Sequence, residues 1–246
     1  MMTRMPHIQL GDEINTRMAI LPGDPKRVER IAKHFDTADD YGMSREYRSI
    51  AGTYKGRRIL AMSTGMGGPS AAIAVEELAK LGVSWIVRIG SSGSLKEDVQ
   101  VGDLVIVTGA IRDDGTSRGY IDTSYPAVAD FTLLTKLKEN AEKLNFPHHM
   151  GICRSHDTMY GDRNPELYRK WAATPAMASD METATVLTIA SLRGVHAASI
   201  LNTVSAFQSD VPSSVGKYAD HERLSMEGEE NEIILALEAL CGLKEV

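Results

Sequence analysis

The sequence predicts an α/β sandwich built as one domain. Short apolar runs rich in β-branched residues alternate along the chain with longer segments of helical periodicity, which is typical of this class. The 246 residues contain no repeat, linker or low-complexity tract, and α/β domains often reach about 250 residues. We therefore expect a single domain over residues 1–246.

Composition excludes several classes of protein. The net charge of -6 argues against a nucleic-acid binder, which usually carries a basic face. The two cysteines, Cys153 and Cys241, form neither a disulfide framework nor a zinc-ligand pattern. The N-terminal residues lack the apolar core of a signal peptide, and no apolar run reaches about 18 residues. We expect a cytoplasmic protein that binds neither nucleic acid nor membrane.

The first strand and helix enclose a candidate anion site. The apolar run Met18–Leu21 predicts a strand, and the turn through Gly23 leads into a helix with Asp24 as N-cap and Pro25 at its first position. The N–H groups of such a helix start attract anions. Arg27 lies in the first turn, where positive charge opposes the helix dipole. It therefore needs either a protein partner or a ligand.

Two strands and a second helix follow. The segments Tyr47–Tyr54 and Arg58–Ser63 read as strands, and the glycine-rich segment 64–70 leads into a helix over Pro69–Leu81 that ends before Gly82. The glycines differ in spacing from a dinucleotide fingerprint, and the acidic residue expected after the next strand is absent. A dinucleotide-binding domain is therefore disfavoured.

The central strand is expected at Trp85–Arg88. The loop Gly90–Ser94 comes directly after it, and its glycines allow backbone N–H groups and hydroxyls to converge on an anion. The fork of donors on Arg88 matches phosphate oxygens. Ligands of open α/β sheets bind just beyond the carboxyl ends of strands. The alternative is an ordinary turn with a surface arginine, and local pattern leaves both open.

The remaining elements continue the alternation. Two polar segments, 112–127 and Ser205–Gly216, read as loops. The expected strands are Asp103–Gly109, His149–Arg154 and Ala197–Val204. The expected helices are Asp130–Leu144, 165–172, Ala184–Leu192 and Asp220–Leu240.

Two carboxylates, Asp180 and Glu182, precede the helix at Ala184–Leu192. Negative charge at a helix start complements the helix dipole, which needs no ligand. Alternatively, a carboxylate at this place accepts hydrogen bonds from the adjacent hydroxyls of a polyol.

Five stretches carry a resemblance to a known family. They are Leu21-Pro-Gly-Asp-Pro-Lys-Arg27, Ser44-Arg-Glu-Tyr47, Ser63-Thr-Gly-Met-Gly-Gly-Pro-Ser70, Arg88-Ile-Gly-Ser-Ser-Gly93 and Asp180-Met-Glu182. In this order and spacing they resemble the purine/uridine nucleoside phosphorylase family over nearly the whole chain. The resemblance implies a three-layer sandwich with a central mixed β-sheet flanked by helices. It also implies reversible phosphorolysis, in which a nucleoside and phosphate give a free base and (deoxy)ribose 1-phosphate. Phosphate is then the co-substrate, and no other cofactor is expected.

The resemblance also implies site residues. Those for phosphate are Gly23, Arg27, Arg45, Arg88 and Ser91. Those for ribose are His7, Asp180, Met181 and Glu182, with Met181 beneath the sugar and Asp180 standing where the family usually has Glu. Arg88, Glu182 and Arg163 are the residues expected to carry catalysis.

The active site is expected to be shared between subunits. Family residues that match Arg45 and His7 cross a dimer interface to the neighbouring subunit's phosphate and ribose 5′-hydroxyl. The resemblance thus implies a homo-oligomer built of dimers, with a hexamer as in much of the family. In some uridine members a monovalent cation lies between subunits at residues that match Glu46 and Ser70. We assign no metal to this chain.

The base pocket departs from both branches of the family. Purine members place an Asp after Thr-Val-Ser to protonate the leaving base, but Ala206 stands here. Uridine members carry a Gln-x-Arg pair shortly after the position of Met159 and Tyr160, and it is absent. We hypothesise that Arg163 supplies the cation, with an amide from Asn164 or Gln208. The expected base-binding residues are Met159, Tyr160, Arg163 and Gln208.

The resemblance favours a uridine-type enzyme, because the segments Ser155–Tyr160 and Tyr125–Phe131 look more like that branch. Purine nucleosides are the alternative, since Thr53–Arg57 and Pro6–Ile8 look more like the purine branch. A hydrolytic nucleosidase is a further alternative, although relatives of that kind lack a full set of phosphate-binding arginines. A non-catalytic nucleoside-binding protein also stays open because of Ala206.

Overall fold

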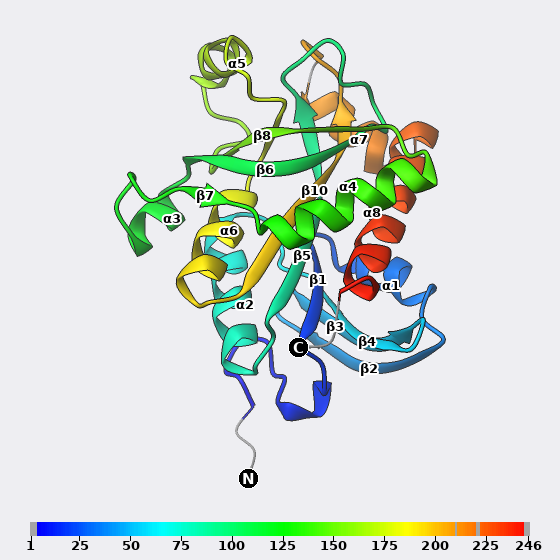
Figure 1. Ribbon diagram of the computed structural model, residues 1–246. Coiled ribbons are helices and arrows are strands. Elements are labelled where there is room, and N and C mark those ends of the chain that lie inside the picture. The colour runs from blue at the N-terminus through cyan, green and yellow to red at the C-terminus, as the bar shows by residue number, and fades with distance from the viewer. Residues whose placement is uncertain (1–3, 210, 220–221, 244–246) are drawn as a thin grey trace.

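One large mixed sheet organises the protein (Figure 1). A computed structural model describes residues 4–209, 211–219 and 222–243. Helices lie on both sides of the sheet, so the predicted α/β class with a central mixed sheet flanked by helices is confirmed.

The strands alternate with helices for most of the chain. The strands are β1 (Met18–Pro22), β2 (Thr37–Ser44), β3 (Tyr47–Tyr54), β4 (Arg57–Met62), β5 (Trp85–Ser94), β6 (Leu104–Asp113), β7 (Ala127–Val128), β8 (His148–His156), β9 (Ala178–Asp180) and β10 (His196–Ser205). The helices are the 3₁₀ turn η1 (Asp12–Ile14), α1 (Pro25–Ala32), α2 (Gly68–Lys80), α3 (Gly115–Tyr120), α4 (Phe131–Leu144), α5 (Asn164–Ala172), α6 (Thr183–Leu192), α7 (Val211–Ala219) and α8 (Arg223–Cys241).

Part of the sheet closes on itself. Strands β5, β10, β6, β8 and β9 pair in a ring, while β1, β4, β3 and β2 extend from β5 as an open sheet. The ring closes because β1 ends at Pro22, opposite Ile89 of β5. The edge of β5 beyond that residue is free, and β9 pairs there through Gly93 and Ser94. Strand β5 thus joins the open sheet to the ring.

Two helical layers cover the sheet. Helices α2, α3 and α6 pack together on one side, and α1, α4 and α8 lie on the other (Figure 1). Each side has its own core: Val75, Leu78 and Leu187 belong to the first, and Val28 and Leu237 to the second. A smaller cluster fills the inside of the ring, formed by Val99, Val105, Val107, Cys153, Ala178 and Leu201.

Several predicted loops are wrong. The stretch Gly90–Ser94 continues β5 as strand, because its backbone pairs with both β10 and β9. The expected loop 112–127 contains α3, and the loop Ser205–Gly216 contains the start of α7. Isolated glycine and proline residues in these segments suggested loops. Pairing with distant strands and side-chain capping of helices decide their structure instead. Asp114, for example, caps α3 by accepting a hydrogen bond from Ser117 N.

Three strands, β2, β7 and β9, were missed, and one helix start differs. Strand β2 is polar and largely exposed, so it lacks the apolar alternation by which strands are recognised. The last helix begins at Arg223 with Glu222 as its cap, and the predicted start at Asp220 lies outside the described residues. Among the described residues, no helix is both long and apolar enough to span a membrane.

Candidate active site

The predicted anion-binding residues meet at the carboxyl ends of β1 and β5. Gly23 directly follows β1, and Ser91 lies on the part of β5 that extends beyond β1. Arg27 lies in the first turn of α1, where Asp24 caps the helix by accepting a hydrogen bond from Lys26 N at 2.9 Å. This is the edge of a parallel α/β sheet where ligands bind.

Arg27 is buried and held by several partners. Its side chain is 3% exposed, and Nη2 donates to Ser91 Oγ at 3.1 Å and to Tyr218 Oη at 2.5 Å. Nε lies 3.0 Å from Glu229 and Nη1 lies 3.1 Å from Glu232. Burial lowers the pKa of Arg27, but the nearby acidic groups outweigh it and raise that pKa above its ordinary value. The partner that a cation in the first helical turn requires is therefore present.

Glu232 is the buried acid beneath this site. One oxygen pairs with Arg27, and Oε2 accepts a hydrogen bond from Gly90 N at 3.1 Å. Burial raises the pKa of Glu232 to about 8, although Arg27 acts to lower it. Ionisation of this acid is therefore costly in the folded protein.

Arg88, predicted to bind phosphate, contacts the two acidic residues predicted to bind ribose. Its Nη2 donates to Asp180 at 3.1 Å and to Glu182 at 2.6 Å, and the side chain is 3% exposed. Its Nη1 is buried and has no hydrogen-bond partner within the described residues. A buried donor of this kind is costly to leave unpaired, so it is available to an anion placed beside it.

The carboxylate of Asp180 accepts several hydrogen bonds from other residues of the protein. Its oxygens accept hydrogen bonds from Thr183 N and Oγ1, at 3.0 and 2.6 Å, and from Ser155 Oγ at 2.5 Å. They also accept from Arg88. Asp180 thus holds Arg88 and the start of α6 together. Its predicted contact with a ribose hydroxyl stays a prediction.

Glu182 lies where α6 begins. Its Oε1 accepts from Gly67 N at 2.5 Å, and its Oε2 accepts from Arg88. Gly67 has a φ of 92°, a conformation that favours glycine and lets its N–H point at the carboxylate. Burial raises the pKa of Glu182, Arg88 acts to lower it, and Asp180 adds to the increase. Met181, between the two acids, is half-buried.

Arg45 and His7 lie on neighbouring segments. Arg45 is exposed in the turn between β2 and β3, with a φ of 55°. Ser44 Oγ donates to the carbonyl of His7 at 2.7 Å, which ties the two segments together. The His7 ring contacts Glu77 at 2.6 Å, and its side chain is 41% exposed. These two residues therefore share one surface.

Glu46 and Ser70 flank the same glycine. A Cβ built at Gly65 would lie 2.8 Å from Glu46 Cγ and 3.5 Å from Ser70 Oγ. Among the described residues, no group of three or more His, Cys, Asp or Glu side chains is arranged to hold a metal ion.

The expected base-binding residues lie in two separate connections, Met159, Tyr160 and Arg163 between β8 and α5 and Gln208 after β10. Tyr160 is 82% exposed, and Arg163 is 75% exposed beside Glu166 at 3.6 Å. Gln208 has a φ of 58°, and its backbone N–H donates to Tyr168 Oη. Met159 is half-buried. The structure does not bring Arg163 to Arg88 and Glu182, and its role in catalysis stays a prediction.

The sequence analysis missed the residues of the last helix and one histidine. Glu229 and Glu232 of α8 are buried and bind Arg27 from about 200 positions along the chain. The available signal was their spacing of three residues on an apolar helix, which places both carboxylates on the buried face. His156, at the end of β8, was also overlooked, although it directly precedes the predicted base-binding segment.

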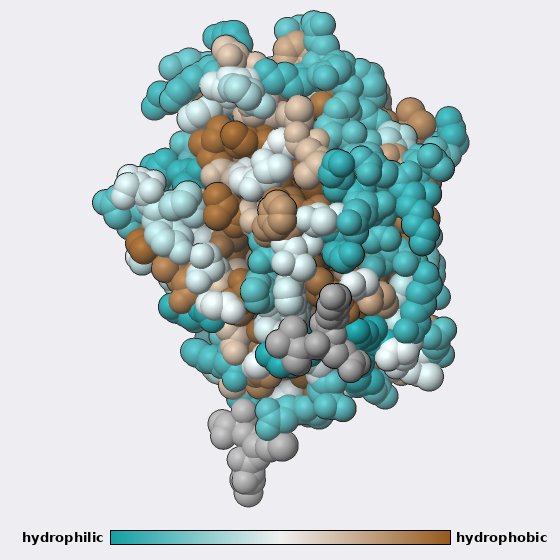
Figure 2. All heavy atoms as spheres, in the orientation of Figure 1, coloured by the Kyte–Doolittle hydropathy of each residue, from teal (hydrophilic) through white to brown (hydrophobic). Residues whose placement is uncertain are grey.

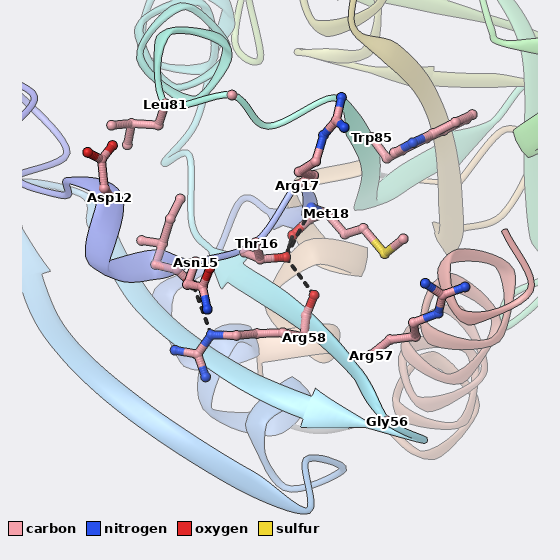
Figure 3. A pocket seen from close by; sticks show the side chains of 12 residues that line it. Asp12, Asn15, Thr16, Arg17, Met18, Gly56, Arg57, Arg58, Leu81 and Trp85 are labelled. Atoms are coloured by element: carbon pink, nitrogen blue, oxygen red, sulfur yellow. Dashed lines mark hydrogen bonds between the residues drawn. The ribbon is translucent and has the colours of Figure 1, made fainter. Parts of the chain in front are cut away.

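A cavity lies at the opposite end of the sheet (Figure 3). It has a volume of about 670 Å³ and is lined by the starts of β1, β4 and β5, including Met18 and Trp85. Arg58 Nε donates to the carbonyl of Ile14 at 2.9 Å there, so this arginine holds the N-terminal segment in place. The amino ends of the strands are not where such sheets bind ligands.

Comparison with known proteins agrees with this arrangement. The model of the phosphorylase superfamily matches residues 17–239. A uridine phosphorylase from Treponema pallidum is 38% identical over 95% of this chain and 92% of its own length. A guanosine phosphorylase from Halorubrum lacusprofundi is 40% identical over 81% of this chain and 82% of its own. The crystal structure of a uridine phosphorylase from Vibrio fischeri ES114 superposes with a TM-score of 0.92 at 38% identity, covering 98% of both chains.

The predicted membership of the nucleoside phosphorylase family is thereby confirmed, and the five sequence motifs that carried it lie within or beside the matched range. The chain belongs to the phosphorylase superfamily.

Proposed function

We propose that this protein is a nucleoside phosphorylase of the uridine type. It cleaves the N-glycosidic bond with phosphate and gives a pyrimidine base and (deoxy)ribose 1-phosphate. The observation that carries the proposal is the buried pair Arg27 and Arg88, held at the carboxyl ends of β1 and β5 with Ser91 and Glu182 beside them.

The arrangement suits phosphorolysis. Breaking the glycosidic bond develops positive charge on the ribose, so an anionic phosphate is both nucleophile and electrostatic partner. Arginines fixed before the substrates bind can orient that phosphate without further reorganisation. Glu182, bonded to Arg88, offers its carboxylate to the ribose diol next to the phosphate. No covalent intermediate with the enzyme is needed.

The base pocket lacks both of the family's usual base-contacting groups, since Ala206 replaces the Asp of purine members and the Gln-x-Arg pair of uridine members is absent. The uridine phosphorylases among the relatives support pyrimidines. The guanosine phosphorylase keeps purine nucleosides as the second candidate.

A homo-oligomer with shared active sites is part of the proposal. Arg45 and His7 lie on one surface, and the exposed side chains of Met43 and Met66 flank it at 58% and 88% exposure. Exposed apolar side chains of this size are typical of an interface between proteins. We place a second copy on this surface, so that Arg45 and His7 complete the partner's site.

A second apolar surface fits the larger assembly. Val128, Phe131 and Ile152, on β7, α4 and β8, are exposed, and hydrophobic side chains gather over these elements in Figure 2. A hexamer would bury this surface between dimers. The cytoplasmic location also stays a prediction.

The proposal is tested by base release from a nucleoside panel, with and without phosphate. Uridine, thymidine, inosine, guanosine and adenosine are compared. Release from uridine or thymidine that requires phosphate is expected. Release from purine nucleosides alone would show that the protein is a purine nucleoside phosphorylase. Release without phosphate would identify a hydrolase. Nucleoside binding without any release would identify a non-catalytic binding protein.

A further inference from the structure

His156 ends β8 beside the residues that organise the candidate site. The preceding residue, Ser155, donates to Asp180 at 2.5 Å and accepts from Ala184 N at 2.9 Å. The backbone at His156 is therefore fixed to Asp180 and the start of α6. The His156 ring is partly buried, and its Nδ1 is a buried atom without a hydrogen-bond partner in the described part of the chain.

The strand register places His156 on the same face as Ser91, one of the predicted phosphate residues, and Met181, one of the predicted ribose residues. Arg154 pairs with Ser179, and Ser179 pairs with Gly93, so these three share one face of the ring. Side chains alternate along a strand, so residues two positions apart face the same way. Ser91, two before Gly93, and His156, two after Arg154, therefore belong to this face. Met181, two after Ser179, leaves the end of β9 on the same side.

This face carries buried polar atoms without a hydrogen-bond partner among the described residues, and it has space beside them. Ser179 Oγ, like His156 Nδ1, is buried without a hydrogen-bond partner among the described residues. Gly93 has no side chain, and a Cβ there would meet only Ser205 Cβ, at 3.8 Å. Buried polar groups are normally paired. Two unpaired groups beside an open glycine mark a place where a polar, flat ligand can bind.

The charges around His156 favour the neutral imidazole. Burial lowers the pKa of His156, and the neighbouring cation of Arg154 lowers it further, while Asp180, Asp113 and the backbone of Thr158 act to raise it. Arg154 is itself paired with Asp113 at 2.8 Å. A neutral imidazole carries one donor and one acceptor, so it can pair with the edge of a nucleobase.

We infer that His156 is the residue that contacts the leaving base and donates a hydrogen bond to it during glycosidic cleavage. The inference rests on the proposed phosphorylase activity and deepens it. Phosphate at Ser91, ribose above Met181 and base beside His156 then follow one another across a single face of the ring. Ala206, after β10, leaves its own position without an acid, and His156 supplies a donor from the end of β8.

The donor matters because the departing base takes up the electron pair of the glycosidic bond. A hydrogen bond aimed at an atom where negative charge develops stabilises the transition state more than the ground state. The need for this help depends on the base. A base that is a stronger acid leaves more easily and needs the donor less.

The test uses His156→Ala and His156→Asn in the full-length enzyme, with His149→Ala as the matched control. His149 lies on the same strand but is paired with Asp103 at the other end. We would measure kcat/KM for phosphorolysis of 5-methyluridine, uridine and 5-fluorouridine, whose bases become more acidic in that order. If the panel shows a purine enzyme, inosine and 7-methylinosine replace them, because the methylated base leaves without further activation.

Because the donor is lost, His156→Ala should lower kcat/KM on the order of 30-fold with uridine. The decrease should be larger with 5-methyluridine and only a few-fold with 5-fluorouridine. His156→Asn, which keeps an N–H donor, should recover part of the loss, and His149→Ala should resemble the wild type. An equal loss with all substrates, or a loss under about threefold with uridine, would overturn the role while the phosphorylase activity stands. A wild-type protein without phosphate-dependent release would overturn both.

Discussion

Arg88 Nη2 lies 2.6 Å from Glu182 Oε2, in a place where the two side chains are 3% and 9% exposed. The residue predicted to bind phosphate and the residue predicted to bind ribose are therefore bonded to each other. Glu182 Oε1 is fixed separately by Gly67 N. The predicted phosphate residue and the predicted ribose residue consequently belong to one connected network, and a change at either residue should affect the use of both substrates.

Replacement of Arg88 should damage both activity and stability. Arg88→Ala leaves Asp180 and Glu182 as buried carboxylates without their cation, which costs about 3–5 kcal/mol when a buried pair is broken. Arg88→Lys keeps the charge but loses the planar fork that matches phosphate. We expect Arg88→Lys to fold and to lose at least about tenfold in kcat/KM for phosphate. Steady-state kinetics and thermal unfolding separate the two effects.

Arg223→Ala is the control for that experiment. Its side chain is 76% exposed and pairs with Glu227 on the surface of α8, and such pairs contribute about 0–1 kcal/mol. It should match the wild type in both measurements. Wild-type phosphate kinetics in Arg88→Lys would contradict the phosphate assignment.

Glu182→Gln should weaken the interaction with ribose in the transition state. The amide still accepts from Gly67 N, but it loses the charge that pairs with Arg88 and that accepts from the ribose diol. We expect a cost of about 2–4 kcal/mol in transition-state stabilisation, which is a loss on the order of 30- to 1,000-fold in kcat/KM. The penalty should shrink with 2′-deoxyuridine, which has one hydroxyl fewer. A similar penalty for both nucleosides would argue against a direct contact with the diol.

Mixing inactive subunits tests the shared site. If Arg45 serves the partner, Arg45→Ala and Arg88→Lys damage every site in their own homodimers but leave one intact site in each mixed dimer. Co-expression or re-association of the two variants should then restore activity to about a quarter of the wild-type value, as random pairing in a two-fold dimer requires. The activity of the mixture would stay at the sum of the separate variants if Arg45 acted within its own chain.

Glu232 makes stability depend on pH in a stated direction. Its pKa is about 8 in the folded protein because of burial, above the ordinary value of 4.5. The folded state therefore holds a proton that the unfolded state has lost between these two values, so the free energy of unfolding falls as pH rises from about 4.5 to about 8. Glu232→Gln removes this term.

The measurement for Glu232 is urea unfolding of wild type and Glu232→Gln at several pH values. The stability of the variant relative to the wild type should improve steadily from pH 5 to pH 8, because each unit of pKa difference is worth about 1.4 kcal/mol. Glu227→Gln, on the exposed side of the same helix and paired with Arg223, is the matched control and should not alter the slope. Parallel curves for wild type and Glu232→Gln would show that Glu232 does not titrate in this range.

Local pattern was sufficient to predict much of the fold. The buried strand at Trp85, the cap at Asp24 and the helix over Ala184–Leu192 depend on neighbours within a few positions, and these were predicted correctly in type. Arg27 was recognised as needing a partner because its position in a helix start is itself a local fact. The family resemblance then supplied the chemistry.

Tertiary structure alone decided what surrounds those residues. The acids that hold Arg27 come from α8, about 200 residues away, and no local pattern joins such distant segments. The face on which His156 lies depends on the register of β8 with β9 and of β9 with β5. A shift of one residue would turn that side chain to the opposite face. The sequence by itself therefore predicted which residues bind an anion, whereas long-range strand pairing determined which of them share a surface.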